Sequence, residues 1–198
     1  MYSFKHMTVR LPGLRTALAM LLAGGLCQST ELSAAEPPAV AEEYDLKAAF
    51  LFNLAKFVQW PPEKFAGEES ALIIGIRGVE AVDRFTRLLR SKTIGKRKLI
   101  VQRLTNLAEL PSCHIVFVCR SEKEDPARWT EAGKLAGALT VGETQQFLEQ
   151  GGMIQFAMES QELRLEINEQ CARKAGLTIM ANVLATLVNK GIAKIRNF

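Results

Sequence analysis

Histidine is the scarcest side chain with catalytic chemistry in this sequence. The 198 residues include two histidines, His6 and His114. Ser-His and Cys-His nucleophilic centres need an imidazole as general base, and zinc sites commonly use several. The sequence therefore argues against a histidine-based catalytic centre, and we expect no catalytic residue, no metal and no cofactor. His114 precedes the apolar run 115–118, where we expect a hydrogen-bonded histidine at the end of a strand.

Apolar runs long enough to cross a membrane as a helix are also missing. The run at 17–26 is about half as long as the ~20 residues that a spanning helix needs. Arg10 and Arg15 precede this run and the small residues 33–35 follow it, in the order of a secretory signal peptide. We expect residues 1–35 to be removed near Ala35, leaving a secreted protein with no membrane insertion.

The sequence also lacks a strong excess of positive or of negative charge. Without residues 1–35 the chain keeps 22 of its 25 basic and 20 of its 21 acidic residues. Such a nearly neutral chain lacks the basic footprint of a nucleic-acid-binding protein, and no nucleic-acid partner is expected. We expect a flexible lead-in at 36–41, which contains two prolines, and a single α/β domain over 42–198.

Continuous apolar runs alternate with helical patterns along this domain. Strands are predicted at 72–76, 98–101, 113–118 and 138–142, and helices from 42 to the stop at Trp60 and at 80–89, 125–137 and 144–150. Runs of Val, Ile and Leu without polar alternation are typical of parallel strands that are buried on both faces. The pattern therefore predicts a mostly parallel sheet that helices cover on both faces.

The last two predicted strands break this parallel rule. Residues 153–158 and 163–167 flank a polar turn at 159–162, and so short a link makes neighbouring strands antiparallel. Asn168 follows as the predicted N-cap of a helix, because its side-chain oxygen can accept from a free amide of the first turn. The expected fold class is α/β, with a mostly parallel sheet and a C-terminal antiparallel hairpin strand.

Glycines follow two of the predicted elements. Gly75 and Gly78 end the first strand, but their spacing gives neither G-x-G-x-x-G nor a P-loop, and a tight turn is expected. Gly151 and Gly152 lie between a helix and a strand. We expect a positive φ there, with close approach of a ligand to the backbone as the alternative.

Three cysteines remain after removal of the signal peptide. Cys113 and Cys119 lie at the two ends of one predicted strand, about 20 Å apart at ~3.3 Å per residue. A disulfide needs Cα atoms within ~7 Å, so these two cannot pair. The antiparallel strand ends at Ile167, on the sheet edge where the strand of Cys113 begins. Cys171 is therefore expected nearer Cys113, and these two form the candidate disulfide.

Two sequence blocks resemble the YfiR family of periplasmic regulatory proteins. The first is KAAFLFNLAKFVQWP at 47–61, and the second runs from LTVGETQQFLEQGGMIQF at 139–156 through LRLEINEQCARKAGLTI at 163–179 to VLATLV at 183–188. The resemblance brackets roughly residues 44–190, and neither block is a catalytic signature.

This resemblance implies a function. The best-known members bind the periplasmic sensor region of an inner-membrane diguanylate cyclase and lower its cyclic-di-GMP output. By resemblance, the chain is a non-enzymatic regulator of such a cyclase and of biofilm formation, able to form a homodimer. Disulfide-bearing members carry cysteines where this chain has residues 72–74 and 153–154, so their redox mechanism is not carried over.

Candidate binding residues lie where the last predicted strand meets the following helix. Arg164 and Arg173 flank the predicted cap Asn168, and two guanidinium groups suit a ligand carboxylate or an acidic partner. Trp60, which precedes two prolines, is the candidate aromatic anchor for a partner. The alternative roles are capping and surface charge for the first three residues, and a plug over the sheet edge for Trp60.

Two alternative functions stay open. A crevice at one end of the parallel strands suits a small molecule or a peptidoglycan fragment. A hydrolase would use carboxylates such as Glu159 and Glu166, whose separation does not follow from the sequence.

Overall fold

A computed structural model describes residues 38–122, 125–159 and 162–196 of the chain, all within one unit, Glu36–Phe198. The expected signal peptide at 1–35 lies outside the described residues. Among the residues that are described, no helix is long and apolar enough to cross a bilayer.

The first helix, α1 (Pro38–Phe57), begins earlier than the sequence pattern indicates. The lead-in expected over 36–41 is therefore helical from Pro38 onward. Proline is compatible with the first turn of a helix, because the amide it lacks has no intrahelical partner there. The helix ends before β1 (Val58–Gln59), which pairs antiparallel with β9 (Thr178–Ile179) in a small separate sheet.

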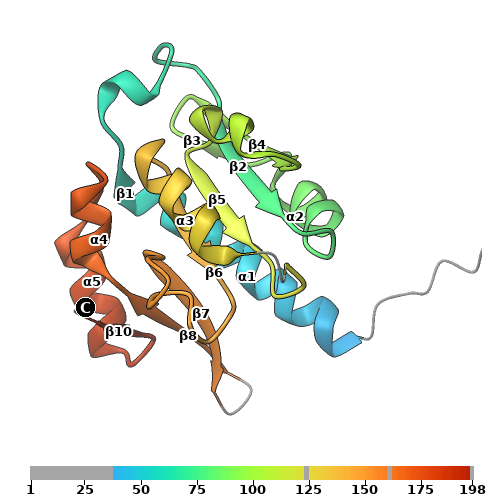
Figure 1. Cartoon of the computed structure of the whole chain (residues 1–198), viewed down its shortest axis with the longest axis vertical. Coiled ribbons are helices and arrows are strands. Elements are labelled where there is room, and N and C mark those ends of the chain that lie inside the picture. The colour runs from blue at the N-terminus through green and yellow to red at the C-terminus, as the bar shows by residue number, and fades with distance from the viewer. Residues whose placement is uncertain (1–37, 123–124, 160–161, 197–198) are drawn as a thin grey trace, which may run out of the picture. The chain divides into compact units, whose positions relative to one another are not determined.

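The main sheet has eight strands in the order β10-β8-β7-β6-β5-β2-β4-β3. Its strands are β2 (Leu72–Arg77), β3 (Thr93–Ile94), β4 (Arg97–Arg103), β5 (Ile115–Val118), β6 (Leu139–Gly142), β7 (Ile154–Glu159), β8 (Glu162–Ile167) and β10 (Ala193–Ile195). Strands β4, β2, β5, β6 and β7 pair in parallel, whereas β8 pairs antiparallel with β7. The predicted fold class, including the C-terminal antiparallel hairpin, is confirmed (Figure 1).

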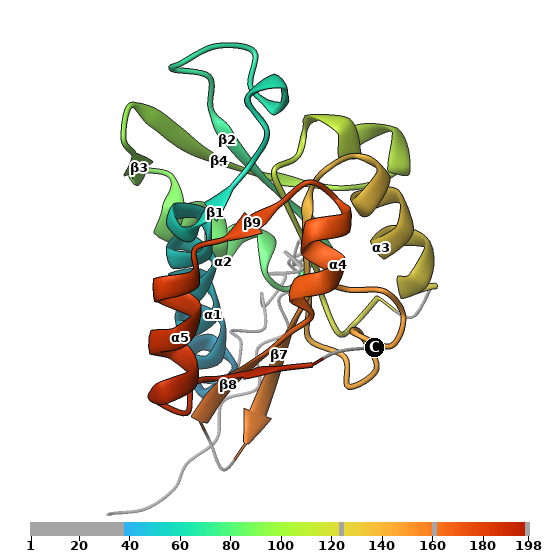
Figure 2. The same ribbon diagram turned by 90° about the vertical axis from the view of Figure 1, so that its left-hand side faces the viewer.

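Helices lie on both faces of this sheet, as the apolar strands require. The remaining helices are α2 (Val82–Leu89), α3 (Pro126–Leu135), α4 (Glu169–Lys174) and α5 (Ala181–Asn189), with short 3-10 helices η1 (Pro62–Lys64) and η2 (Leu107–Ser112). Figure 2 shows α1, α2 and α5 on one face and α3 on the other. The larger apolar core lies under the first group and includes Leu51, Phe85 and Phe117. The smaller core, which includes Leu110 and Trp129, lies under η2 and α3.

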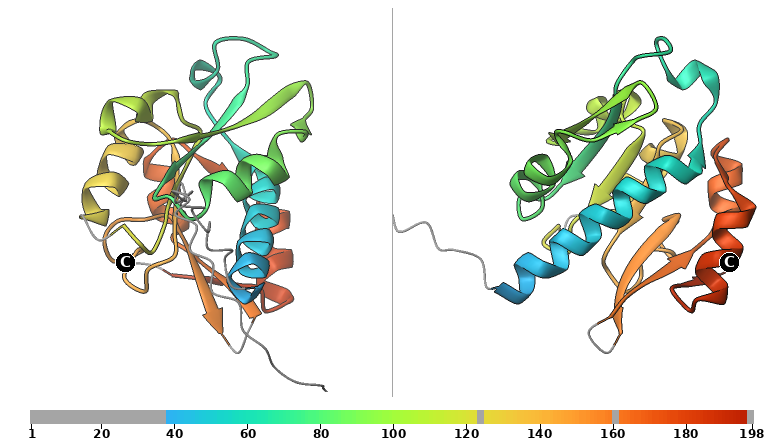
Figure 3. Two further views of the ribbon diagram at one scale, coloured as in Figure 1. Left: turned by 90° about the vertical axis from the view of Figure 1, so that its right-hand side faces the viewer. Right: turned by 180° about the vertical axis from the view of Figure 1, so that it is seen from behind.

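The order of the strands creates a switch point between β2 and β5. From β2 the chain passes through α2 to β4 on one side, and from β5 it passes through α3 to β6 on the other. In open α/β sheets the crevice at the carboxyl ends of two such strands is where ligands bind. Figure 3 shows α1 running along the face of the sheet that it covers together with α2 and α5.

The segment 144–150 forms turns in place of the predicted helix. It folds around Phe147, which is fully buried between two glycines. A Cβ atom on Gly142 would lie 2.3 Å from the ring of Phe147, and one on Gly152 would lie 2.2 Å from it. Gly151 has a φ of +87°. These glycines are thus required for packing and for the turn, which agrees with the expected positive φ.

Candidate functional site

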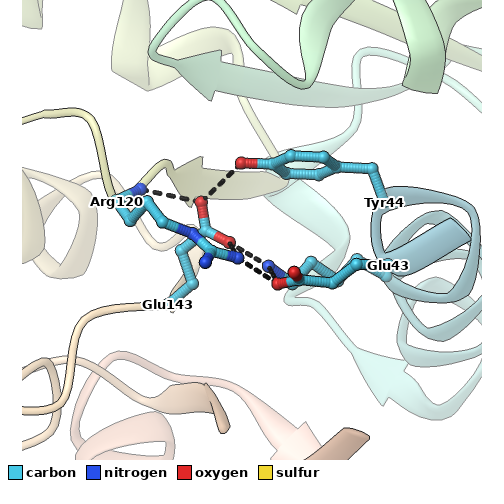
Figure 4. Close-up of polar contacts among 5 residues, drawn as sticks. Glu43, Tyr44, Arg120 and Glu143 are labelled. Atoms are coloured by element: carbon cyan, nitrogen blue, oxygen red, sulfur yellow. Dashed lines mark hydrogen bonds and ion pairs between the residues drawn. The ribbon is translucent and has the colours of Figure 1, made fainter. Parts of the chain in front are cut away.

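Five polar side chains gather near the switch point and form the candidate site. We call them the carboxyl-edge cluster: Glu43, Tyr44 and Lys47 of α1, Arg120 after β5, and Glu143 after β6 (Figure 4). The α1 residues recur at helical spacing on the side that faces the sheet, whereas Arg120 and Glu143 follow neighbouring parallel strands. The cluster therefore joins α1 to the carboxyl ends of β5 and β6.

Glu143 accepts most of the hydrogen bonds in this cluster. One carboxylate oxygen accepts from the hydroxyl of Tyr44 at 3.0 Å and from the backbone amide of Arg120 at 2.7 Å. The other oxygen pairs with the ammonium of Lys47 and lies 3.4 Å from the guanidinium of Arg120. The side chains of Lys47 and Glu143 are only 1% and 2% exposed. Both oxygens of a buried carboxylate are thus occupied by donors within the protein.

Glu43 completes the cluster at its solvent side. It pairs with both Lys47 and Arg120. Burial acts to raise the pKa of Glu43, but the hydrogen bonds and charges of Lys47 and Arg120 outweigh it and hold the pKa below its ordinary value. Burial, together with the charge of Glu143, raises the pKa of Tyr44. The carboxylate of Glu43 stays ionised and the phenol of Tyr44 stays neutral at physiological pH.

Arg120 lines two surface cavities beside this cluster, of about 210 and 570 Å³. The smaller cavity reaches Phe156 and Met158 of β7, and the larger one reaches Thr144 and Gln150. Within the described residues, no group of three or more His, Cys, Asp or Glu side chains is placed to hold a metal ion. The arrangement offers a charged, hydrogen-bonding surface, but its carboxylates are neutralised by internal partners.

Asn168 and Arg173 lie at the junction of β8 and α4, whereas Arg164 lies in the first half of β8, four residues before Asn168. The side chain of Asn168 caps α4 by accepting from the amide of Cys171 at 2.9 Å. Arg164 contacts Glu162 and donates to the carbonyl of Gly191. Arg173, with its side chain 61% exposed, pairs with Glu169 at 2.8 Å. The two guanidinium groups therefore contact different partners and are not joined by a shared ligand-binding carboxylate.

Trp60 covers the opposite, amino-terminal edge of the central strands. Its indole nitrogen donates to the carbonyl of His114 at 3.0 Å, and Phe65 stacks on the imidazole at a centroid distance of 4.4 Å. The imidazole Nδ1 accepts from the amide of Ile73 at 3.1 Å. Burial, followed by the charge of Lys64, lowers the pKa of His114 to about 4. Trp60 and His114 thus form a partly buried structural contact at this edge.

The thiols of Cys113, Cys119 and Cys171 are free in the structure. Cys113 contacts the side-chain amide of Gln102 at 3.5 Å, whereas Cys171 donates to the carbonyl of Gly151 at 3.3 Å. The pairing of Cys113 with Cys171 expected from the sequence is therefore not made. Strands β6 and β7 lie between β5 and β8, so β5 and β8 are about 14 Å apart at ~4.8 Å per strand. The registers also place Ile167 level with Phe117, two residues past the start of β5.

Glu159 and Glu166, the carboxylates suggested for a hydrolase, are separated by the register of the hairpin. Glu159 lies opposite Glu162, four residues from Glu166 along β8. Their backbone positions are therefore about 13 Å apart along the strand. Glu159 pairs with Lys194 at 2.9 Å, and Glu166 pairs with Arg196 at 2.6 Å.

The carboxyl-edge cluster was missed at the sequence level, although one signal points to it. Lys47 lies on the apolar stripe of α1, three residues after Tyr44 and four before Leu51, which are also buried. A lysine at an inward position of a helix needs an anionic partner, because an unpaired buried charge is very costly. The sequence does not identify that partner as Glu143, which lies 96 residues away.

The fold and the cluster together define an α/β domain whose buried charges are paired internally. A family model matches residues 44–186, and the chain belongs to the YfiR/HmsC-like family. No curated protein matches the chain. A solved structure described as a conserved domain protein from Vibrio cholerae O1 biovar eltor is 14% identical, with a TM-score of 0.49, and the match covers 77% of this chain and 59% of that one. The match thus spans less than two thirds of the length of that protein.

Proposed function

We propose that the protein is secreted to the periplasm and acts there as a regulatory binding protein. Its target is the periplasmic sensor region of an inner-membrane diguanylate cyclase, which it restrains so that less cyclic-di-GMP is made. The observation that carries this proposal is membership of the YfiR/HmsC-like family across residues 44–186. That range begins in α1 and ends in α5, so it includes the whole carboxyl-edge cluster except Glu43.

The chemistry of the charged side chains supports binding over catalysis. A general base or nucleophile needs a free lone pair within reach of substrate. Both oxygens of Glu143 are occupied by donors of the protein, and Glu43 is held by two cations. The other two carboxylates considered, Glu159 and Glu166, each pair with a different cation, Lys194 and Arg196. The pairs of Glu43 and Glu143 are suited to holding α1 on the sheet.

The proposed contact surface for the cyclase lies at the junction of β8 and α4. Arg173 is exposed there, and Arg164 lies on the preceding strand. Charge-assisted hydrogen bonds from a guanidinium group to a carboxylate contribute roughly 1.5–3 kcal/mol each. Each guanidinium group carries five N–H donors, so Arg164 and Arg173 can bind acidic side chains of the cyclase while they keep their present partners Glu162 and Glu169. The capping role of Asn168 keeps this junction ordered.

Capture from detergent-solubilised membranes tests this function. The tagged mature protein should retain a membrane diguanylate cyclase, and the Arg164→Ala, Arg173→Ala double variant should retain about ten to a hundredfold less. A matched control replaces Arg128 and Lys190, which are exposed on other elements, with alanine and removes the same charge. Failure to capture a cyclase, or capture of peptidoglycan fragments alone, contradicts the function. Equal capture by the double variant contradicts only the contact surface.

A further inference from the structure

We propose that one end of the sheet, formed by β3, β4 and α2, is a docking surface for an anionic phospholipid bilayer. The sequence from 84 to 103 contains eight basic residues and no acidic one, although the chain without residues 1–35 is nearly neutral. The eight are Arg84, Arg87, Arg90, Lys92, Lys96, Arg97, Lys98 and Arg103. Positive charge is therefore concentrated in one part of a protein whose net charge is nearly zero.

Arg84 and Arg97 are held by hydrogen bonds to other parts of the protein, whereas Lys92 only lies over the ring of Phe52 at 5.9 Å. Arg84 donates to both carboxylate oxygens of Asp45, at 2.5 and 2.6 Å, and so ties α2 to α1. Arg97 donates to the carbonyl of Ser70 at 2.9 Å and lies over the ring of Phe65 at 3.8 Å. These contacts orient both guanidinium groups toward the protein. They are not counted in the docking surface.

The other six side chains are exposed, and we call them the basic edge: Arg87, Arg90, Lys92, Lys96, Lys98 and Arg103. They come from neighbouring elements, because α2 packs on β4 and β3 pairs with β4. Figure 3 shows α2 and the β3–β4 hairpin together at one end of the sheet. Lys96 has one distant ion pair, with Glu69 at 3.7 Å, in which both side chains are more than 70% exposed. Such a pair contributes little in water.

On a second copy of the chain, the segment 159–169 does not offer a matching acidic surface. The segment 159–169 holds four glutamates, but each pairs with a cation of the same molecule. Docking the basic edge there would require four internal pairs to break. The gain in charge attraction would then be offset by the loss of the existing pairs.

The composition of the edge also argues against a tight protein interface. Such interfaces are anchored by buried aromatic and apolar side chains, with charge at the rim. Among the described residues from 84 to 103, Ile100 is the one large hydrophobic side chain that is strongly exposed, at 45%. A surface with six cationic side chains and one exposed isoleucine suits a fluid layer of phosphate headgroups, which adapts to the positions of the charges and needs no anchor.

The consequence would be a regulator held at the membrane surface without insertion. Each basic side chain near an anionic leaflet strengthens binding by about fivefold, and the attraction decays within the Debye length of ~8 Å at physiological salt. Retention at the surface would concentrate the protein beside a membrane-bound cyclase. That consequence rests on the proposed function, whereas the binding to lipid does not.

Vesicle co-sedimentation with the purified mature protein tests the proposal. Binding is expected to vesicles of phosphatidylcholine with phosphatidylglycerol and not to vesicles of phosphatidylcholine alone. It should fall steeply as sodium chloride rises from ~0.05 to ~0.5 M, because the Debye length shortens. Absence of binding to the anionic vesicles, or equal binding to both kinds, overturns the proposal. Binding to heparin or duplex DNA without binding to vesicles overturns it in favour of a different polyanion.

Two variants with the same loss of charge locate the surface. Arg87→Gln, Arg90→Gln and Lys98→Gln together should weaken binding to anionic vesicles by about a hundredfold, at fivefold for each. Arg128→Gln, Lys174→Gln and Lys190→Gln together should bind like the unmodified protein, since these exposed residues lie on other elements. Equal weakening by both variants would mean that net charge acts alone, and overturns the basic edge. Cyclase capture in detergent, where no bilayer exists, tests the proposed function separately.

Discussion

Lys47 and Glu143 form an ion pair in which the two side chains are 1% and 2% exposed. The pair joins the middle of α1 to the end of β6, and its partners are 96 residues apart in the sequence. Burying two charges is favourable only where their remaining hydrogen-bonding capacity is satisfied. Tyr44, Arg120 and Glu43 meet that condition, because they supply the other contacts of the pair.

Removing one partner of this pair should therefore destabilise the protein strongly. Glu143→Gln or Lys47→Met removes the buried counter-ion of the remaining charge, which keeps only a partner at the solvent side of the cluster, and we expect a loss of about 3–5 kcal/mol in the free energy of unfolding. Urea denaturation measures this loss in the free energy of unfolding. The double variant should lose less than the sum of the two single losses. Lys194→Ala, which breaks an exposed pair with Glu159, serves as the control and should cost less than ~1 kcal/mol. Equal losses at both sites would contradict the buried pairing.

His114 should make the protein less stable at mildly acidic pH. Its folded pKa of about 4 lies below its ordinary 6.5, because the buried imidazole stays neutral. Between these two values the unfolded chain binds a proton that the folded protein does not. Stability is therefore retained above pH 6.5 and lost as the pH falls toward 4, by up to about 3 kcal/mol.

Urea unfolding at a series of pH values from 7 to 4 checks this expectation. In His114→Gln the titrating group is gone, so the variant should lose less stability than the unmodified protein over the same range. If the free energy of unfolding fell equally with pH in the two proteins, His114 would not be the cause of the pH dependence.

The three thiols should react with alkylating reagents in a fixed order. Cys113 and Cys119 are fully buried, and burial raises the pKa of both thiols. Cys171 is partly exposed, so it should be labelled first in the native protein. Peptide mapping by mass spectrometry after brief labelling measures the order. A native disulfide between Cys113 and Cys171 would contradict the strand order described above.

Much of the fold could be predicted from the sequence because its central strands are continuous apolar runs. The run ending at Val118 and the run ending at Gly142 each match one strand, and the polar turn at 159–162 fixes the antiparallel hairpin. The strand at Ala193–Ile195 was not predicted, because a three-residue edge strand with lysine at its centre resembles a solvated terminus. Its pairing with β8 depends on contacts far apart in the sequence.

The candidate site was less predictable than the fold. Asn168 was correctly predicted as a cap, because capping is local and depends on neighbouring residues. The carboxyl-edge cluster depends on which strands lie side by side, and no short pattern specifies that Arg120 and Glu143 follow adjacent strands. The predicted disulfide also depended on the order of the strands in the sheet. It is not formed in the structure, because strands β6 and β7 separate Cys113 from Cys171.

Intracellular cyclic-di-GMP in a deletion strain tests the central claim most directly. A chain that restrains a cyclase should, when deleted, raise cyclic-di-GMP and biofilm matrix, and deletion of the partner cyclase as well should abolish the rise. Expression of the chain from a plasmid should restore the original level. Unchanged cyclic-di-GMP in the deletion strain, or a rise that persists without any membrane cyclase it can capture, would contradict the proposed regulatory role.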